Sequence, residues 1–335
     1  MRIALDAMGG DDAPRVVVEG AIASLNQWDD VHLVLIGDEQ QIRLHLKESH
    51  PRLEIIHTEE RIDATEEPVR AVRRKKQASM VLAGDLLKNK QVDAMISAGN
   101  TGALMTVGLL VVGRIDGIER PGLASTMPTL DGRGVLVLDL GANMDASPQH
   151  LLQYGIMGAL YQQIIHSGEV ARVGLLNVGS EKKKGNELTK ATYELLENSS
   201  LSFIGNVEAR DLLNGGCDVV VCDGFAGNIL LKSMEGAVVA AMSVLKRELT
   251  SNWFSKLGAL LLKNSFRKFK KAFDYTEHEG ALLLGVNGVC IKSHGSSNAR
   301  MIHKTIGQAR KAVQHRLIDS ITDQIVRIEG GNVCN

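Results

Sequence analysis

The chain has 335 residues, of which 44% are apolar and 23% are charged, a composition that excludes a disordered or collagen-like protein. Its 38 Lys and Arg residues balance 39 Asp and Glu residues, so the net charge of −1 argues against a nucleic-acid binder that depends on bulk positive charge. The four cysteines show no metal-ligand spacing and are too few for a disulfide framework, so we expect a reduced, cytoplasmic protein.

Short apolar, β-branched segments alternate with longer helical segments along the chain. Buried strands are predicted at residues 3–7, 31–36, 53–57, 94–97, 134–140, 173–178, 201–205, 219–222 and 288–292. Nearly continuous apolar character is typical of a parallel sheet covered on both faces. Helices are predicted between the strands, among them residues 69–88, 101–113, 149–167, 186–197 and 297–314. This alternation predicts an α/β fold, a three-layer α/β/α sandwich with a mostly parallel sheet.

The sequence contains neither a Ser/Pro-rich linker nor an internal repeat, so residues 1–335 are predicted to form a single catalytic domain. Residues 225–273 are almost entirely helical in pattern, with too little strand to join the sheet. Residues 240–275 are therefore predicted to form a protruding helical pair. The N-terminal segment lacks the apolar core of a signal peptide, and uninterrupted apolar runs stay short of the ~18 residues that span a bilayer.

Glycine and small polar residues follow the predicted strands, at residues 6–11, 97–102, 139–143, 177–179, 223–228 and 294–297. Ligands of open α/β sheets bind at the carboxyl ends of strands, where a helix that begins directly afterwards points free N–H groups at an anion. One such turn is ordinary in any α/β protein. Six of them predict a polar cleft that accepts an anion.

Familiar catalytic motifs are missing from these turns. The first strand is not followed by G-x-G-x-x-G, and the chain has neither a P-loop nor a G-x-S-x-G nucleophile elbow. Two residues stand out instead. Lys184, next to Gly185 at a predicted helix start, could place a positive charge on a phosphate, although a solvated loop explains it equally well. His294 follows a strand beside Gly295, where a structural or capping role is the alternative.

One combination of motifs is more specific than any single turn. It consists of the string Asp6-Ala7-Met8-Gly9-Gly10-Asp11 together with residues 97–102, Arg120-Pro121, residues 223–228 and His294-Gly295. With these motifs the whole chain resembles the acyl-carrier-protein:phosphate acyltransferases of bacterial phospholipid synthesis. The resemblance implies a fold like that of isocitrate and isopropylmalate dehydrogenases. It also implies a homodimeric cytoplasmic enzyme, peripherally associated with the inner face of the cell membrane and without a cofactor.

The reaction implied by the resemblance is transfer of a long-chain fatty acyl group from acyl carrier protein to inorganic phosphate. The acyl phosphate would then serve a membrane glycerol-3-phosphate acyltransferase. Phosphate, with a second pKa of roughly 6–7, is already an anionic nucleophile near neutral pH. A thiol that ionises at about 8.5 is a tolerable leaving group. The enzyme therefore has to hold the dianion and stabilise the developing oxyanion, without a metal or a covalent intermediate.

Site residues follow from location and residue type. We expect phosphate to be positioned by Gly99, Asn100, Thr101, Gly102 and Lys184. The thioester oxygen is expected to be polarised by His294, Ser296 or Asn228, with Asp223 orienting these groups rather than attacking.

Residues 253–273 hold four of the six Phe residues and one of the two Trp residues, interleaved with Lys and Arg. Aromatic anchors, an apolar tip and flanking cations suit an anionic membrane surface. The expected membrane contacts are Trp253, Phe254, Leu257, Leu260, Leu261 and Leu262. A dimer interface is the alternative, and one segment could serve both.

A second basic cluster, within the predicted helix 69–88, consists of Arg70, Arg73, Arg74, Lys75 and Lys76. It could steer the acidic acyl carrier protein, and an ordinary solvated helix face is the alternative. Two other functions remain open at this stage. One is an NAD-dependent decarboxylating dehydrogenase of similar fold, for which a nicotinamide site and an Asp cluster are hard to assemble. The other is a membrane-bound scaffold, which would have no use for an anion-accepting cleft.

Overall fold

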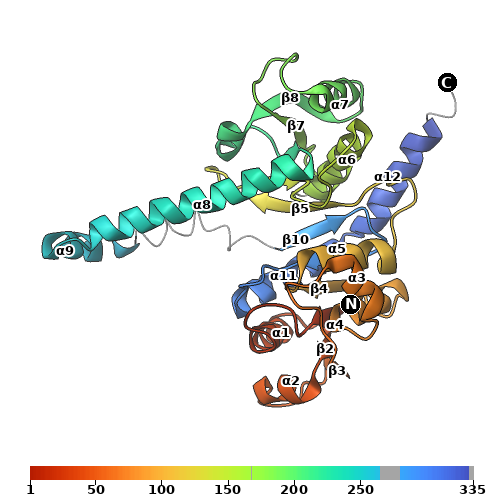
Figure 1. Ribbon diagram of the computed structural model, residues 1–335, viewed down its shortest axis with the longest axis vertical. Helices are drawn as coiled ribbons and strands as arrows, with labels where there is room; N and C mark the ends of the chain where they lie inside the picture. Colours follow the sequence, from red (N-terminus) through yellow and green to blue (C-terminus); the bar gives the residue numbers. More distant parts are fainter. Residues whose placement is uncertain (167, 265–279, 332–335) are drawn as a thin grey trace. The chain divides into compact units, whose positions relative to one another are not determined.

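The structure is a computed structural model that describes residues 1–166, 168–264 and 280–331. The chain divides into two compact units (Figure 1). Unit 1 comprises Met1–Ser125, Ile156–Ala171 and Glu279–Asn335, and unit 2 comprises Thr126–Gly155 and Arg172–His278. Each unit combines a sheet with helices, so each is an α/β structure of its own.

The strands of unit 1 form a mostly parallel sheet. Their order is β3 (Leu53–His57), β2 (His32–Gly37), β1 (Arg2–Asp6), β4 (Ala94–Ser97), β11 (Val289–Lys292), β10 (Ala281–Leu284) and β5 (Gly122–Met127). Pairing is parallel from β3 through β11, and β10 is antiparallel to both of its neighbours. Because β1, β4 and β11 run the same way, their carboxyl ends meet at one edge of the sheet.

Helices cover the sheet of unit 1. They are α1 (Arg15–Gln27), α2 (Glu39–His45), α3 (Pro68–Arg74), α4 (Ser79–Lys88), α5 (Thr101–Val107, continued by a π-helical turn over Gly108–Val112), α11 (Ala299–Gln314) and α12 (Leu317–Gly331). Helix α6 (Pro148–Ile165) begins in unit 2 and ends in unit 1. Ala4, Met95 and Cys290 are buried neighbours on β1, β4 and β11, and they belong to the same core as the apolar residues of α4 and α5.

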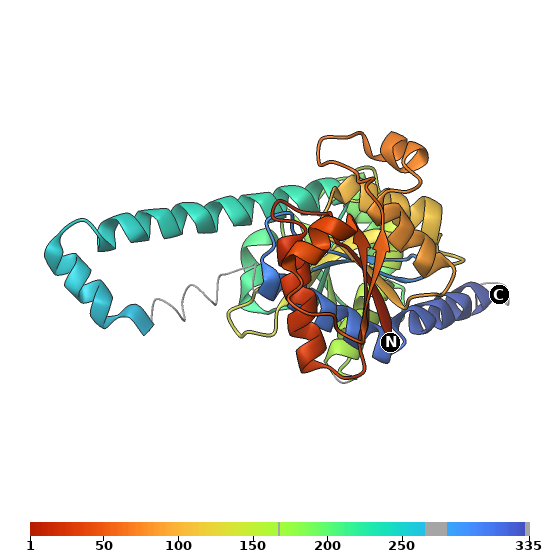
Figure 2. The same cartoon turned by 90° about the horizontal axis from the view of Figure 1, so that it is seen from below.

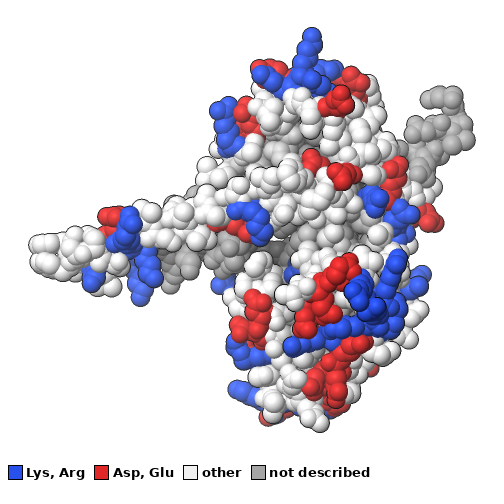
Figure 3. All heavy atoms as spheres, in the orientation of Figure 1, with Lys and Arg blue, Asp and Glu red and all other residues white. Residues whose placement is uncertain are grey.

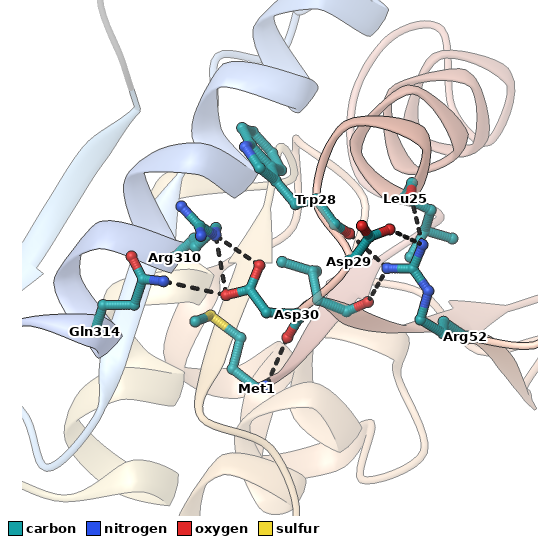
Figure 4. Close-up of polar contacts among 9 residues, drawn as sticks. Met1, Leu25, Trp28, Asp29, Asp30, Arg52, Arg310 and Gln314 are labelled. Atoms are coloured by element: carbon teal, nitrogen blue, oxygen red, sulfur yellow. Dashed lines mark hydrogen bonds and ion pairs between the residues drawn. The ribbon is translucent and has the colours of Figure 1, made fainter.

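Helices α1 and α11 pack directly on each other, and polar contacts fasten the end of α1 (Figure 4). The Arg52 guanidinium donates hydrogen bonds to the carbonyl oxygens of Leu25 and Val31 at 2.7 and 3.0 Å. Arg310 of α11 donates to the Asp30 carboxylate at 2.9 Å. The bond to Leu25 satisfies one of the carbonyl groups that the end of a helix leaves without an intrahelical partner.

Unit 2 has a parallel sheet with the order β6 (Val135–Leu138), β9 (Val219–Val221), β7 (Arg172–Asn177) and β8 (Ser202–Glu208). Its helices are α7 (Glu187–Glu197), a 3-10 helix (Ala209–Asn214), α8 (Gly224–Leu249) and α9 (Trp253–Leu261). The first turns of α8 belong to the core, because Gly224, Gly227 and Leu230 are buried. The rest of α8 extends away from the strands of unit 2 and carries α9 at its far end (Figures 1 and 2).

The sequence-based fold class is confirmed, and every predicted strand is present within a few residues of its expected bounds. One predicted helix is wrong, because residues 69–88 form two helices, α3 and α4. The break between them is fixed by side chains that bind its backbone. Thr58 Oγ1 donates to the Gln77 carbonyl at 2.6 Å, and the Gln77 N–H donates to Glu60 at 2.9 Å.

In the helical segment after residue 224 the structure describes α8 and α9, whereas residues 265–279 lie outside the described residues. Phe266, Phe269 and Phe273 are among them. The single catalytic domain predicted for residues 1–335 and the helical pair predicted for residues 240–275 stay predictions.

The packing of α1 on α11 predicts the effect of a Gly20→Ala substitution. A Cβ atom at Gly20 would lie 2.7 Å from Ile302 Cβ and 2.7 Å from the Ala299 carbonyl oxygen. We expect the substitution to destabilise the fold by about 1–3 kcal/mol, because two helices must move apart. Gly236→Ala is the matched control on α8, where a Cβ meets no atom within 4 Å. It should stabilise by up to ~1 kcal/mol through helix propensity. Thermal unfolding of both variants measures the difference, and equal midpoints would contradict the close packing.

Candidate active site

A row of polar residues crosses the carboxyl ends of three neighbouring strands in unit 1. Asp6 of β1 is paired in register with Ser97 of β4, which is paired with Lys292 of β11. The row lies two residues beyond Ala4, Met95 and Cys290, on the same face of the sheet. All three side chains are buried, with exposed fractions of 3%, 0% and 8%. A buried carboxylate and a buried ammonium therefore replace the apolar core at the edge where ligands of such sheets bind.

The Asp6 carboxylate is held by three donors. Ser79 Oγ and Ser97 Oγ donate to it at 2.5 and 2.6 Å, and the Met8 N–H donates at 3.2 Å. Distances this short are typical of hydroxyl groups that donate to an ionised carboxylate. Burial raises the pKa of Asp6, while these hydrogen bonds and the nearby charge of Lys292 act in the opposite direction.

The Lys292 ammonium binds two main-chain carbonyl groups. Its Nζ donates to the Ala98 carbonyl oxygen at 3.3 Å and also to the Ser293 carbonyl oxygen. Burial lowers the pKa of Lys292 to about 8, and the charges of Asp6 and Asp11 work against this shift. Lys292 thus connects the loop after β4 with the loop after β11.

Glycines bring the loop after β1 against both of these loops. A Cβ at Gly9 would lie 2.6 Å from the Gly99 nitrogen, and Gly10 has a φ of +109°. The Asp11 N–H donates to the Gly295 carbonyl oxygen at 2.8 Å. The distinctive glycine pair of the sequence is therefore explained by close backbone approach, which a side chain would prevent.

The segment predicted to bind phosphate has two parts with different roles. The Gly99 N–H donates to Ser97 Oγ at 3.0 Å. Asn100 caps α5 by accepting from the Ala103 N–H, and its amide nitrogen donates to the carbonyl oxygens of residues 63, 64 and 66. Gly99 and Asn100 thus shape the loop. Thr101 and Gly102 form the first turn of α5, where N–H groups have no intrahelical acceptor.

His294 and Ser296 share a short loop after β11. The Ser296 N–H points at His294 Nδ1 at 3.2 Å, and Ser296 Oγ lies 2.8 Å from the same nitrogen. An N–H group can only donate, so Nδ1 is the acceptor and the ring proton of the neutral imidazole is on Nε2. The imidazole is exposed, so Nε2–H can serve as a hydrogen-bond donor at the rim of these loops.

Unit 2 has a buried polar turn of its own, in which Asp139, after β6, has an exposed fraction of 0%. Its carboxylate accepts from the N–H groups of Ala142 and Asn143 at 3.0 and 2.6 Å. The Asn143 carbonyl in turn accepts from the Gly224 N–H at 2.8 Å, which attaches this turn to the start of α8.

Asp223 and Asn228 lie together at that helix start. Asp223 is the N-cap of α8 and accepts from the Ala226 N–H at 2.8 Å. Asn228 is partly buried, with its Cγ 3.6 Å from a Cβ built on Gly141. Asp223 therefore caps α8, and its predicted role of orienting the groups around the thioester stays a prediction.

Lys184 lies in the loop after β7, also in unit 2. Its side chain is 53% exposed and its Nζ is 4.0 Å from Glu181. A hydrogen bond fixes the main chain of the loop, because the Asn177 amide donates to the Lys184 carbonyl oxygen at 3.2 Å. Gly185 has a φ of +91°, and a Cβ there would lie 2.1 Å from Thr189 Oγ1. The backbone of Lys184 is fixed while its ammonium reaches solvent.

Five of the six apolar residues predicted to contact a membrane are exposed on and just after α9. Their exposed fractions are 65% for Trp253, 68% for Phe254, 51% for Leu257, 65% for Leu260 and 52% for Leu262. Leu261 is the last residue of α9.

Helix α8 is the one described helix long and apolar enough, by length and composition, to cross a membrane. The sequence pattern did not predict this, because the charged residues Lys232 and Glu235 interrupt its apolar run; in the fold they form an ion pair at 2.8 Å.

Two buried charged residues of unit 1 were not among the predicted site residues. Lys292 was counted only as the end of a strand, and Asp6 only as part of a motif. The signal for Lys292 is a lysine that ends the otherwise apolar segment Val-Cys-Ile-Lys directly before the Ser-His-Gly turn.

Comparison with known proteins identifies the family. Residues 1–320 match the family described as "Fatty acid synthesis protein". The phosphate acyltransferase of Shouchella clausii (strain KSM-K16) is 55% identical over 97% of this chain and 98% of its own length. That of Halalkalibacterium halodurans is 53% identical over 99% and 98%. The chain belongs to the phosphate acyltransferase family. The resemblance inferred from the sequence is thereby confirmed, and the protein is an acyltransferase of lipid synthesis.

Solved structures share the fold. A phosphotransacetylase from Streptococcus pyogenes superposes with a TM-score of 0.61 at 19% identity, over 94% of each chain. A branched-chain phosphotransacylase from Enterococcus faecalis V583 gives a TM-score of 0.59 at 12% identity, over 93% of this chain and 99% of that one. At these identities the similarity supports the α/β architecture of the phosphate acyltransferase family.

Proposed function

We propose that the protein transfers a long-chain fatty acyl group from acyl carrier protein to inorganic phosphate and releases an acyl phosphate for phospholipid synthesis. Membership of the phosphate acyltransferase family supports phosphate as the acceptor. The proposal rests above all on the loops of unit 1, where the first turn of α5 and the His294 imidazole, whose Nδ1 accepts from the Ser296 N–H, flank the same loop cluster. The free N–H groups of the helix turn suit an anion such as phosphate, and the imidazole N–H suits the carbonyl oxygen of a thioester.

In the proposed reaction, a phosphate oxygen attacks the thioester carbonyl carbon and the carbon–sulfur bond breaks. The thiolate of the carrier leaves and takes a proton from solvent, and the mixed anhydride remains. Phosphate arrives ionised and thus needs no general base. Positioning contributes several kcal/mol of the barrier, and each well-placed oxyanion donor roughly 3 kcal/mol.

Each predicted residue receives one role. The N–H groups of Thr101 and Gly102 bind phosphate, and Gly99 and Asn100 shape their loop. His294 donates from Nε2 to the thioester oxygen, with Ser296 holding its tautomer. Lys184, Asp223 and Asn228 belong to unit 2. We assign Lys184 to phosphate and Asn228 to the thioester as the second candidate donor, with Asp223 orienting the start of α8.

The reaction is tested with palmitoyl-acyl carrier protein and phosphate, scoring free thiol and acyl groups trapped by hydroxylamine.

Lys184→Ala should raise the KM for phosphate about tenfold with a smaller effect on kcat, because a point charge on a bound anion is lost. Lys183→Ala is the control, since Lys183 is an exposed neighbour in the same loop. An unchanged phosphate KM in Lys184→Ala would remove Lys184 from the site.

We further propose that the protein is a homodimer in the cytoplasm that binds the inner face of the cell membrane through α9. Helix α8 starts inside the core of unit 2, where Gly227 would clash with the Asp139 carbonyl oxygen if it carried a Cβ. A helix anchored in this way favours an interfacial location over a transmembrane one. Exposed apolar residues along α8, such as Val239 and Val244, suit the dimer contact. This location would deliver acyl phosphate to a membrane glycerol-3-phosphate acyltransferase.

Leu257→Glu combined with Leu260→Glu should release the protein from vesicles that contain phosphatidylglycerol. Affinity should fall at least ~tenfold, because carboxylates replace apolar anchors at an anionic surface. Turnover of soluble substrates should persist. The control pairs Leu44→Glu with Val170→Glu, whose side chains are 82% and 74% exposed in unit 1. Vesicle co-sedimentation measures binding, and undiminished binding of the α9 variant would contradict this location.

The basic cluster on and after α3 is the proposed docking surface for the acidic carrier. Arg70, Arg73 and Arg74 are exposed, whereas Lys75 forms an ion pair with Glu66 at 2.6 Å. Basic side chains gather over α3 and the loops beside it (Figure 3). Complementary charge of this kind acts mainly on the rate of encounter.

Arg73→Glu combined with Arg74→Glu should lower kcat/KM for acyl carrier protein about tenfold at low salt and less at high salt, because ions screen the interaction. Lys47→Glu with Lys88→Glu makes the same charge change at exposed positions of the same unit. Kinetics at two ionic strengths distinguish the variants. Equal losses in both pairs, or a loss independent of salt, would argue against docking at α3.

A further inference from the structure

We propose that Lys292 is a positioning residue, whose ammonium fixes the loop after β4 against the loop after β11. It thereby sets the spacing between the groups that hold phosphate and thioester. The inference rests on the proposed function and concerns a residue that touches neither substrate. Its basis is the pair of carbonyl groups that Lys292 binds.

The two carbonyl groups immediately precede the functional loops. Nζ donates to the carbonyl oxygens of Ala98 and Ser293, and each belongs to the peptide bond that leads into Gly99 or His294. A shift of either peptide plane would move the start of α5 or the imidazole. An ammonium has three donors and no acceptor, so one Lys292 side chain can hold both planes at once.

A purely structural residue at this position would be apolar. The preceding inward-facing residue of β11 is Cys290, in the apolar core, and Lys292 is 8% exposed. Taking an ammonium out of water carries a large desolvation cost. Apolar replacement of a whole buried ion pair is often neutral or stabilising, whereas removal of one partner is strongly destabilising because the other charge stays buried. A change in the stability of Lys292→Met alone therefore does not separate the two roles, and kcat with its pH profile does.

The charge of Lys292 depends on carboxylates of unit 1. Asp6 on β1 and Asp11 in the following loop are the charged groups that act on it, and both favour the ammonium. Ser97, between Asp6 and Lys292 in the row, is neutral and donates to Asp6. The pKa of Lys292 is about 8, so the charge is present below this pH and is lost as the pH rises through it.

The test compares Lys292→Met, Lys292→Arg and Asp6→Asn with the wild-type enzyme. Lys292→Met should lower kcat about 100-fold, the cost of misplacing reacting groups by an ångström, and should also lower the thermal midpoint, because Asp6 stays buried without its counter-charge. Lys88→Met, an exposed position on α4, should leave kcat unchanged. Wild-type kcat should decline above a pH of about 8.

The pH profiles make the test independent of whether Lys292→Met folds. In Lys292→Arg the alkaline decline should disappear, because a guanidinium stays charged. In Asp6→Asn it should move to lower pH, because the carboxylate that favours the ammonium is gone. Unmoved profiles in both variants would overturn the proposal. A folded Lys292→Met that keeps kcat within about threefold would do the same.

Thiol release and trapped acyl groups are measured in the same reactions. A wild-type protein that forms no acyl phosphate contradicts the proposed function itself. Wild-type turnover combined with unaffected Lys292 variants contradicts only the role of Lys292.

Discussion

A buried charge pair at the edge of a sheet is the constraint on which unit 1 depends. Asp6 and Lys292 sit in register on either side of Ser97, and each charge is surrounded by hydrogen-bonding groups. Such a pair gains little net stability, because desolvation offsets the attraction between the charges. Its effect is geometric. The carboxylate holds the loop after β1 through Met8, and the ammonium holds the loops after β4 and β11.

This arrangement fits a reaction in which the nucleophile needs no activation. A dianion that attacks a thioester requires N–H donors at fixed distances more than it requires a general base. Backbone N–H groups supply such donors only if their loops are rigid, and loops of glycine and small residues are not rigid by themselves. In our proposal, the buried row of Asp6, Ser97 and Lys292 supplies the rigidity through its hydrogen bonds to these loops. The sequence lacks a nucleophile elbow, which is consistent with a site that positions an already ionised nucleophile.

The sequence predicted the parts of the molecule that follow from local pattern. Apolar runs located the strands from β1 to β4, and turn composition located the loops at their ends. The break between α3 and α4 was missed because it depends on Thr58 and Glu60, which lie in a preceding loop. The role of Lys292 was missed for a related reason. A lysine at a strand end ordinarily reaches solvent, and only the pairing of β1, β4 and β11 reveals that this one is buried in one row with Ser97 and Asp6.

Helix α8 links the chemistry of the protein to its proposed location. Its N-terminus is bound into the polar turn of Asp139 and Asn143, and its far end presents α9 with exposed aromatic and leucine side chains. A long acyl phosphate is amphiphilic, with an apolar tail that water disfavours by ~0.8 kcal/mol for each methylene group. Release next to a lipid surface removes that cost. In our proposal, α8, which Asp223 caps, connects a predicted site residue to the apolar side chains of α9 that are predicted to contact the membrane.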